Sequence, residues 1–183
     1  MTIYELLKKD HREVEKLFKQ IEECMEEEDF DEAESLFDTL RTELTAHSKA
    51  EAEVFYQPLK MVAKNDEGED LAWEGEQEHH VVALMLNELS RLRAEADEEE
   101  YKSKIKVLCE LVDHHVEEEE GEIFPEAKKV FSNKEAEEIG RNFQELKEKY
   151  KGMVDAALAE DIAILMSPIT KRGGRVQNIQ RSL

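Results

Sequence analysis

The sequence predicts an all-α protein, an up-down-up-down four-helix bundle followed by a fifth helix and a C-terminal tail. Three observations indicate this fold class. The 183 residues include 7 Gly and 3 Pro, with 39% charged and 40% hydrophobic residues, a composition that favours long helices around a core. Apolar residues recur at spacings of three and four along most of the chain. The chain also matches itself at an offset of 68 residues, as expected for a duplicated helical hairpin.

The first hairpin is expected over residues 3–27 and 31–63. Thr2 and Glu5 have the spacing of a capping box, which starts the first helix. The second helix is expected to be kinked near Pro58, because proline cannot donate a hydrogen bond to the residue four positions before it. Apolar residues continue at helical spacing on both sides of this proline.

The second hairpin follows a turn over residues 64–68. Its first helix is expected over residues 69–95, and its second helix begins near Tyr101 and ends before Ser132. The four helices together define a predicted bundle domain over residues 1–131.

The remaining residues predict one further helix and a basic tail. A helix over about 134–158, within an added segment of residues 132–160, begins with a capping box formed by Ser132 and Glu135. It is expected to pack outside the bundle or to mediate a homodimer. Residues 161–183 change to a basic composition and are expected to form a flexible tail.

The charge balance excludes some partner classes. Lys and Arg number 25 against 46 Asp and Glu, which gives a net charge of -21. A surface this acidic repels phosphate backbones and anionic lipid headgroups, so neither nucleic acid nor a membrane is an expected partner. Cys24 and Cys109 stand far apart and form no CxxC motif, and no apolar run is long enough to cross a membrane. We therefore expect a cytoplasmic protein without a disulfide framework.

The internal repeat superimposes polar residues as well as apolar ones. Asp10-His11 falls on Glu78-His79, and the pair His47 and Glu51 falls on His115 and Glu119, each at the offset of 68. All six of these His and Glu residues occupy steps of the apolar seams that face the bundle interior. The six residues are His11, His47, Glu51, His79, His115 and Glu119.

Two buried carboxylates are costly unless they are protonated or paired with cations. A metal centre provides such a cation, whereas an ordinary polar core without metal is the alternative interpretation. In each His-x-x-x-Glu pair the two side chains lie one helical turn apart on the same face and can reach one ion. Imidazole and carboxylate together suit iron, manganese or zinc better than calcium, and two shared carboxylates suit two bridged ions.

Other residues near this set remain alternatives. His80 and His114 adjoin the predicted ligands and are an alternative ligand pair, although a one-residue step rotates them about 100° around the helix. The acidic run 117–120 is interpreted as a solvated face, with Glu119 as the exception. Tyr56, like Tyr4, is interpreted as core packing or as a phenol near a metal ligand.

These motifs resemble the hemerythrin-like, or HHE cation-binding, family. The resemblance covers about residues 3–130, and its stretches are Asp10-His11, His47-xxx-Glu51, Glu78-His79-His80 and His115-xxx-Glu119-xxx-Ile123-Phe124-Pro125. It implies a hemerythrin-like bundle with a non-haem diiron site. By this resemblance His11 and His47 are terminal ligands of one iron, His79 and His115 are those of the other, and Glu51 and Glu119 bridge them. An oxo or hydroxo group would complete the bridge, with manganese or zinc as alternative metals.

One departure from the family pattern affects the expected function. Oxygen-carrying hemerythrins have a second His one turn after the third-helix ligand, where this chain has Ala83. Glu15, one turn after His11, is a candidate to fill that position. The resemblance therefore implies a protein that binds or responds to oxygen, nitric oxide or peroxide rather than a reversible oxygen carrier. The alternatives are a diiron enzyme that consumes peroxide or oxygen, and an iron-loading protein without small-molecule chemistry.

Overall fold

The computed structural model describes residues 1–63 and 66–166, and its regular structure within these ranges is entirely helical. The predicted all-α class is therefore confirmed. Residues 161–166 of the predicted flexible tail instead form the end of the last helix, and residues 167–183 lie outside the described residues. The elements are α1 (Ile3–Glu26), α2 (Phe30–Glu51), η1 (Ala52–Tyr56), α3 (Gln57–Val62), α4 (Asp66–Leu89), α5 (Glu98–Glu118), η2 (Glu119–Ile123), α6 (Phe124–Val130), α7 (Asn133–Lys151) and α8 (Val154–Met166).

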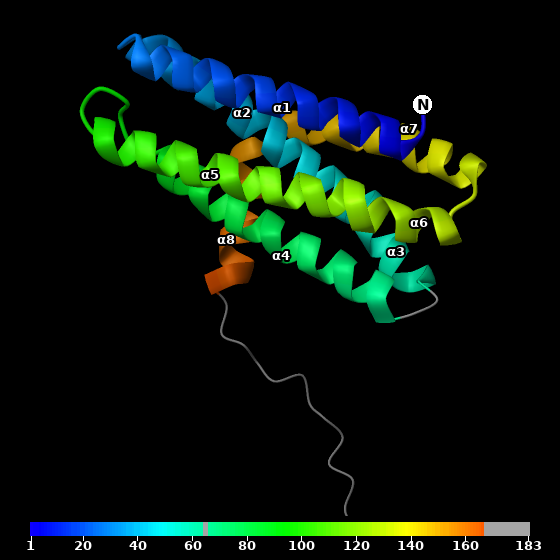
Figure 1. Cartoon of the computed structure of the whole chain (residues 1–183). Helices are drawn as coiled ribbons and strands as arrows, with labels where there is room; N and C mark the ends of the chain where they lie inside the picture. Colours follow the sequence, from blue (N-terminus) through cyan, green and yellow to red (C-terminus); the bar gives the residue numbers. More distant parts are fainter. Residues whose placement is uncertain (64–65, 167–183) are drawn as a thin grey trace, which may run out of the picture.

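Consecutive long helices of the bundle run in opposite directions. α1 packs beside α2, α4 packs beside α5, and α5 also contacts α1, so the four helices enclose one interior (Figure 1). The short helices α3 and α6 extend α2 and α5 at the end of the bundle where the N-terminus lies (Figure 1). Within residues 1–63 and 66–166, no helix combines the length and the apolar character needed to cross a bilayer.

Both predicted capping boxes are present. Thr2 accepts a hydrogen bond from the Glu5 backbone amide at 3.4 Å, and the Glu5 carboxylate accepts from the Thr2 amide at 2.8 Å. Ser132 and Glu135 make the same reciprocal pair at the start of α7. These bonds satisfy backbone amides that have no partner inside the helix, and they fix where α1 and α7 begin.

The sequence predicted a kink near Pro58, but the irregularity precedes the proline. It is a π-helical turn, η1, which begins directly after Glu51, and a second π-helical turn, η2, begins at Glu119. Pro58 and Pro125 follow in the first turn of α3 and α6. A proline has no amide hydrogen to donate to the carbonyl group four residues earlier. For both prolines that carbonyl lies inside the π turn, where the helical backbone widens. Each π turn thus adjoins a predicted ligand carboxylate.

The single helix predicted over 134–158 is two helices, because the chain breaks at Gly152 and Met153 between α7 and α8. α7 packs against α1 and α2, whereas α8 packs against α4 and α2 (Figure 1). The buried face of α7 is therefore covered within the chain. A homodimer through this helix stays a prediction and would need a different face.

The core has two hydrophobic clusters, and the polar residues of the predicted site lie between them. Along α1, Leu7 belongs to the cluster near the N-terminus and Val14 to the other cluster, with His11 between them. Along α2, Leu44 and Ala50 likewise belong to different clusters on either side of His47. The site is thus a polar layer closed above and below by apolar side chains.

Candidate metal centre

The structure brings all six predicted site residues together inside the bundle. Each helix of the bundle supplies one His, and the two Glu come from the end of α2 and the start of η2. The four imidazoles are between 5% and 8% exposed, and both carboxylates are fully buried. The residues are His11, His47, Glu51, His79, His115 and Glu119.

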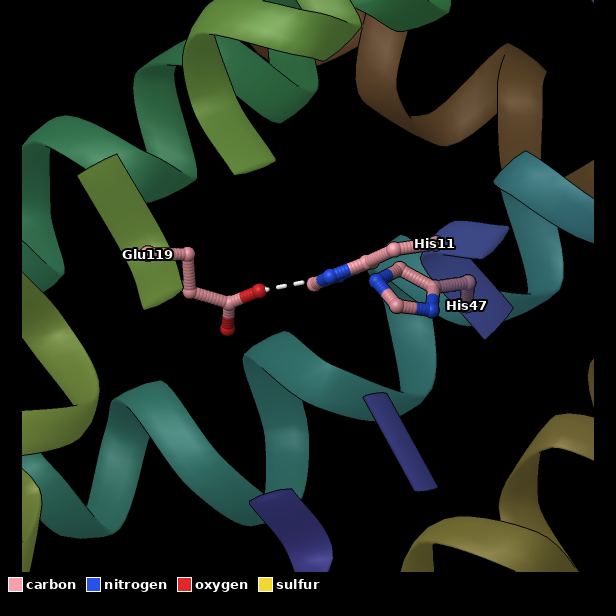
Figure 2. A group of neighbouring side chains, drawn as sticks. All are labelled: His11, His47 and Glu119. Atoms are coloured by element: carbon pink, nitrogen blue, oxygen red, sulfur yellow. Dashed lines mark ion pairs between the residues drawn. The ribbon is translucent and has the colours of Figure 1, made fainter. Parts of the chain in front are cut away.

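The Nε2 atoms of the histidines point toward the two carboxylates and toward one another. Nε2 of His11 lies 3.0 Å from Oε2 of Glu119. Oε2 of Glu51 is 3.3 Å from Nε2 of His47 and 3.4 Å from Nε2 of His79. Nε2 of His79 lies 3.1 Å from Nε2 of His115. Figure 2 shows one part of this group, in which His11 reaches Glu119 while His47 lies alongside.

Carboxylates outside this cluster hold the other nitrogen of three histidines. His47 Nδ1 lies 3.2 Å from Asp10, and His115 Nδ1 lies 2.7 Å from Glu78. His11 Nδ1 lies 2.9 Å from Glu120. A carboxylate at Nδ1 accepts the ring proton there and favours the tautomer whose Nε2 lone pair is free, the arrangement typical of metal-binding histidines.

Lysine partners keep two of these outer carboxylates charged. Burial alone would raise the pKa of Asp10, but His47 and Lys147 outweigh it and lower this pKa to about 2. The pKa of Glu120 is likewise lowered against the effect of burial by Lys8 and His11. Both carboxylates therefore remain hydrogen-bond acceptors at neutral pH.

The fourth histidine breaks this pattern. Nδ1 of His79 is buried and has no hydrogen-bond partner among residues 1–63 and 66–166. In the repeat, His79 corresponds to His11, and Glu120, which pairs with His11, corresponds to Ala52 because 120 minus 52 is 68. A methyl group thus stands where the other half has a carboxylate. The two halves of the site differ in the environment of one imidazole.

The two buried carboxylates differ in charge without a cation between them. Burial, and then the negative charge of Glu119, raise the pKa of Glu51 well above its ordinary value. Burial would also raise the pKa of Glu119, but the neighbouring carboxyl of Glu51 and imidazole of His11 outweigh it and lower this pKa. One carboxyl therefore holds a proton and the other is ionised. Burial, and then the neighbouring imidazole of His115, lower the pKa of His79 well below its ordinary value, so this ring is neutral.

The donor set fits bound cations. Both carboxylate oxygens of Glu51, Oε2 of Glu119 and Nε2 of His11 are buried without a hydrogen-bond partner. Unpartnered buried acceptors of this kind are destabilising in a protein interior and are satisfied by a metal ion. Ligand atoms lie within 4.8 Å of one another in three overlapping sets, namely His11-His47-Glu119, His47-Glu51-His79 and Glu51-His115-Glu119.

Tyr56 adds a hydroxyl to the edge of this cluster. It is fully buried, as expected for a residue that packs in the core. Its hydroxyl also donates a hydrogen bond to Oε1 of Glu119 at 3.4 Å. Burial, and then the charge of Glu119, raise the pKa of Tyr56 well above its ordinary value, so the phenol keeps its proton. Gly75 provides the space, because a Cβ there would lie 2.8 Å from the Tyr56 hydroxyl oxygen.

The residues considered as alternative metal ligands lie outside the cluster of six. His114 is on the surface, 3.2 Å from Glu118, in a separate group with the partly buried Glu78. His80 is partly buried and belongs to none of the three buried sets. Glu15 is exposed and pairs with Lys19 at 2.6 Å, so it does not enter the interior. The position of Ala83 is buried among apolar side chains.

A small cavity of about 20 Å³ adjoins the four imidazoles. A space of roughly 10–15 Å³ suffices for one water molecule, so this cavity has room for one small molecule. Apart from the imidazole rings, the residues that line the cavity are apolar except Ser48. The Ser48 hydroxyl proton is already donated to the Leu44 carbonyl oxygen, at 2.9 Å. The lining residues are His11, Val14, Leu44, His47, Ser48, His79, Val82, Val112, His115 and Val116.

Sequence reasoning missed the outer carboxylates. Glu120 was assigned to a solvated face, yet it is partly buried and bonds to His11. The repeat contained a signal for the other two, because Asp10 and Glu78 are related by the same offset of 68 and each precedes a predicted ligand. No such pattern marks Lys147, which approaches Asp10 from α7.

The fold and this cluster define a class of protein, a helical bundle whose interior binds cations through His and Glu. The chain belongs to the hemerythrin HHE cation-binding domain family, whose model matches residues 2–127. The match contains all six clustered residues and ends before α7.

A curated relative aligns with most of the chain. A DNA nickase of Nostoc sp. (strain PCC 7120 / SAG 25.82 / UTEX 2576) is 24% identical over 149 residues, or 81% of this chain. The aligned region is 40% of the relative, so the chain spans well under half of its length. No solved structure matches the chain significantly.

Proposed function

We propose that the chain binds two iron ions through its six buried His and Glu side chains and uses them to bind or sense oxygen, nitric oxide or peroxide. His11 and His47 would hold one ion, His79 and His115 the other, and Glu51 and Glu119 would lie between them. The overlapping ligand sets support two carboxylates shared between the ions, because each carboxylate belongs to two of the three sets. Manganese and zinc accept the same ligands and remain alternative metals.

The observation that carries the small-molecule part of the proposal is the cavity beside the imidazoles. It is large enough for a diatomic molecule or peroxide and too small for an ordinary metabolite. Its Val and Leu walls favour a weakly polar ligand over bulk water. Bound iron would supply a redox-active Lewis acid next to this space.

The residues of the chain control water, charge and position around that space. The two apolar clusters close the polar layer from both ends. Tyr56 holds Oε1 of Glu119 by its hydroxyl proton, and the outer carboxylates keep Nδ1 protonated on three of the four histidines. This support fixes the Nε2 lone pairs toward the metal positions before an ion arrives.

Metal analysis and visible spectroscopy test the proposal. Protein reconstituted anaerobically with Fe²⁺ should hold about two irons per chain, and its spectrum should change on adding oxygen or nitric oxide. His47→Ala should lose metal, whereas His114→Ala, which changes an exposed His on the same bundle, should retain it. Retention of two irons by His47→Ala contradicts the ligand assignment.

The same experiment separates the other candidate functions. A stable adduct supports a binding or sensing protein, while continuous consumption of peroxide or oxygen indicates a diiron enzyme. Iron uptake without a response to any of these molecules indicates an iron-loading protein. A plasmid-nicking assay checks the activity named for the Nostoc relative, which we do not expect because the net charge of -21 opposes contact with phosphate backbones.

A further inference from the structure

We infer that α7, which lies beyond the family match, is part of the metal centre, and that Lys147 positions His47 through Asp10. This inference rests on the proposed metal binding. Lys147 is a positioning residue, because it touches neither the metal ligands nor the cavity. It sets the ligand geometry of one half of the site only.

The contacts form a continuous chain from α7 to the site. Nζ of Lys147 lies 2.5 Å from Oδ2 of Asp10, and the same oxygen lies 3.2 Å from Nδ1 of His47. Nζ of Lys147 also lies 2.9 Å from Glu43 of α2. Only 8% of Lys147 is exposed, so these two carboxylates stand in for the water that its ammonium group would otherwise contact.

A second side chain of α7 contacts the same histidine directly. Phe143 packs edge-on against the His47 ring, with ring centroids 5.7 Å apart. Phe143 and Lys147 are four residues apart, so both lie on the face of α7 that meets α1 and α2. The ring orientation of His47 is therefore held from two directions by one helix.

Gly140 fixes how closely α7 approaches. A Cβ at this position would lie 2.9 Å from the Met1 carbonyl oxygen and 3.0 Å from the Ile3 amide nitrogen. Both neighbours are backbone atoms and have little freedom to move. The helix can therefore come close enough for Lys147 to reach Asp10 only because residue 140 has no side chain.

Within residues 1–63 and 66–166, the other half of the site has no equivalent ion pair with a lysine. Glu78 occupies the place of Asp10 in the repeat and holds His115, but its other neighbour is the surface imidazole of His114, at 3.9 Å. Loss of Lys147 should thus weaken one of two metal-binding steps. By linkage, metal binding should in turn strengthen the docking of α7.

Metal affinity in matched variants tests this inference. Lys147→Met is compared with the control Lys151→Met, which lies one turn further along α7. Lys151 also forms an ion pair with Glu43, at 2.8 Å, but no contact between Lys151 and Asp10 is found. Fe²⁺ affinity is measured anaerobically by competition with a chromophoric chelator. Lys147→Met should weaken one binding step about 3- to 10-fold, near the lower end of the effect of outer residues on metal sites. The Fe²⁺ affinities of Lys151→Met and of the conservative variant Lys147→Arg should stay within about twofold of that of the unaltered chain.

A second measurement needs no substitution. Hydrogen exchange of the unaltered chain should show α7 amides around Phe143 gaining protection on Fe²⁺ addition, more than α8 amides around Leu158 do. Equal affinities for Lys147→Met and Lys151→Met, or α7 exchange that is unaffected by Fe²⁺, overturn the inference while leaving the metal site intact. Absence of Fe²⁺ binding by the unaltered chain overturns the proposed function and this inference together.

Discussion

Oε2 of Glu78 lies 2.7 Å from Nδ1 of His115, on the neighbouring helix of the second hairpin. Asp10 and His47 repeat this arrangement in the first hairpin at 3.2 Å, and both residues are offset by 68 from their counterparts. In each hairpin the residue before one predicted ligand therefore orients the ligand of the other helix. The duplication preserves the orienting carboxylates together with the ligands.

Glu78→Gln tests this outer support directly. The amide keeps the shape of the side chain but presents a weaker acceptor, so His115 should lose its preference for a protonated Nδ1. We expect metal affinity to fall by about 10- to 100-fold, as for comparable orienting residues, with little loss of stability in the metal-free protein. Chelator competition measures the change.

Glu74→Gln is the matched control for that substitution, because Glu74 lies on the same helix with an exposed side chain. It should leave metal affinity unchanged. Equal affinities for the two variants would show that Glu78 plays no orienting role.

The fold and the central residues were predictable because they follow strong periodic patterns. Apolar spacing gave the four bundle helices, and a constant offset marked residues such as His47 and His115 at core-facing steps. Both capping boxes followed from single residue pairs. These signals are local or are repeated along the chain, so they are readable without knowing the tertiary contacts.

Features that depend on contacts between distant segments were not predictable. Lys147 looks like an ordinary charged residue of an amphipathic helix, and its burial depends on Asp10, 137 positions away. Gly152 ends α7 where apolar spacing continued, so one predicted helix became two. The difference between His11 and His79 at Nδ1 depends on the contact of Glu120 with His11, which joins residues 109 positions apart.

Gly75 and Tyr56 should show coupled effects on stability. Gly75→Ala would place a Cβ 2.8 Å from the Tyr56 hydroxyl oxygen and 3.0 Å from the ring carbon that bears it. Overpacking of this kind costs about 1–3 kcal/mol. Tyr56→Phe removes the hydroxyl, so the double variant should be more stable than the sum of the two single changes implies.

Denaturant unfolding of the metal-free protein measures this coupling, which is independent of iron. Strict additivity of the two substitutions would contradict the close approach of Gly75 to the phenol. In loaded protein, Tyr56→Phe should also alter the visible spectrum, because Glu119 loses its hydrogen-bond donor.

Acid should weaken the attachment of α7 through Glu43. Burial would raise the pKa of Glu43, but Lys151 and Lys147 outweigh it and lower this pKa below the ordinary value of 4.5. A lowered pKa in the folded state means that the ionised form contributes stability above pH 4.5, and that this contribution is lost as the pH falls through the lowered pKa. Unfolding free energy should thus fall with acidification in this range.

Glu43→Gln should flatten this part of the stability profile, whereas Glu145→Gln, an exposed change on α7, should not. Chemical denaturation between about pH 3 and 6 measures both profiles, a range chosen to span the titration of ordinary and lowered carboxyl groups. Identical slopes for Glu43→Gln and the unaltered chain would mean that the ion pairs with α7 do not stabilise the fold.

Glu51→Gln should change stability and metal binding in opposite directions. Burial and the charge of Glu119 raise the pKa of Glu51 well above its ordinary value, so the metal-free fold loses stability as the pH rises above 4.5. A neutral amide does not titrate in this range and therefore removes this loss. The metal-free variant should therefore be more stable than the unaltered chain at pH 7, with a smaller difference near pH 5.

The same substitution removes a carboxylate shared by two ligand sets, so iron affinity should fall sharply and metal should no longer raise the melting temperature. Glu117→Gln, an exposed change on α5, should alter neither property. A stabilised metal-free protein that no longer binds iron is the signature of a functional site whose charges are held for a cation. A destabilised variant with unchanged metal content would instead indicate that Glu51 belongs to a structural polar core.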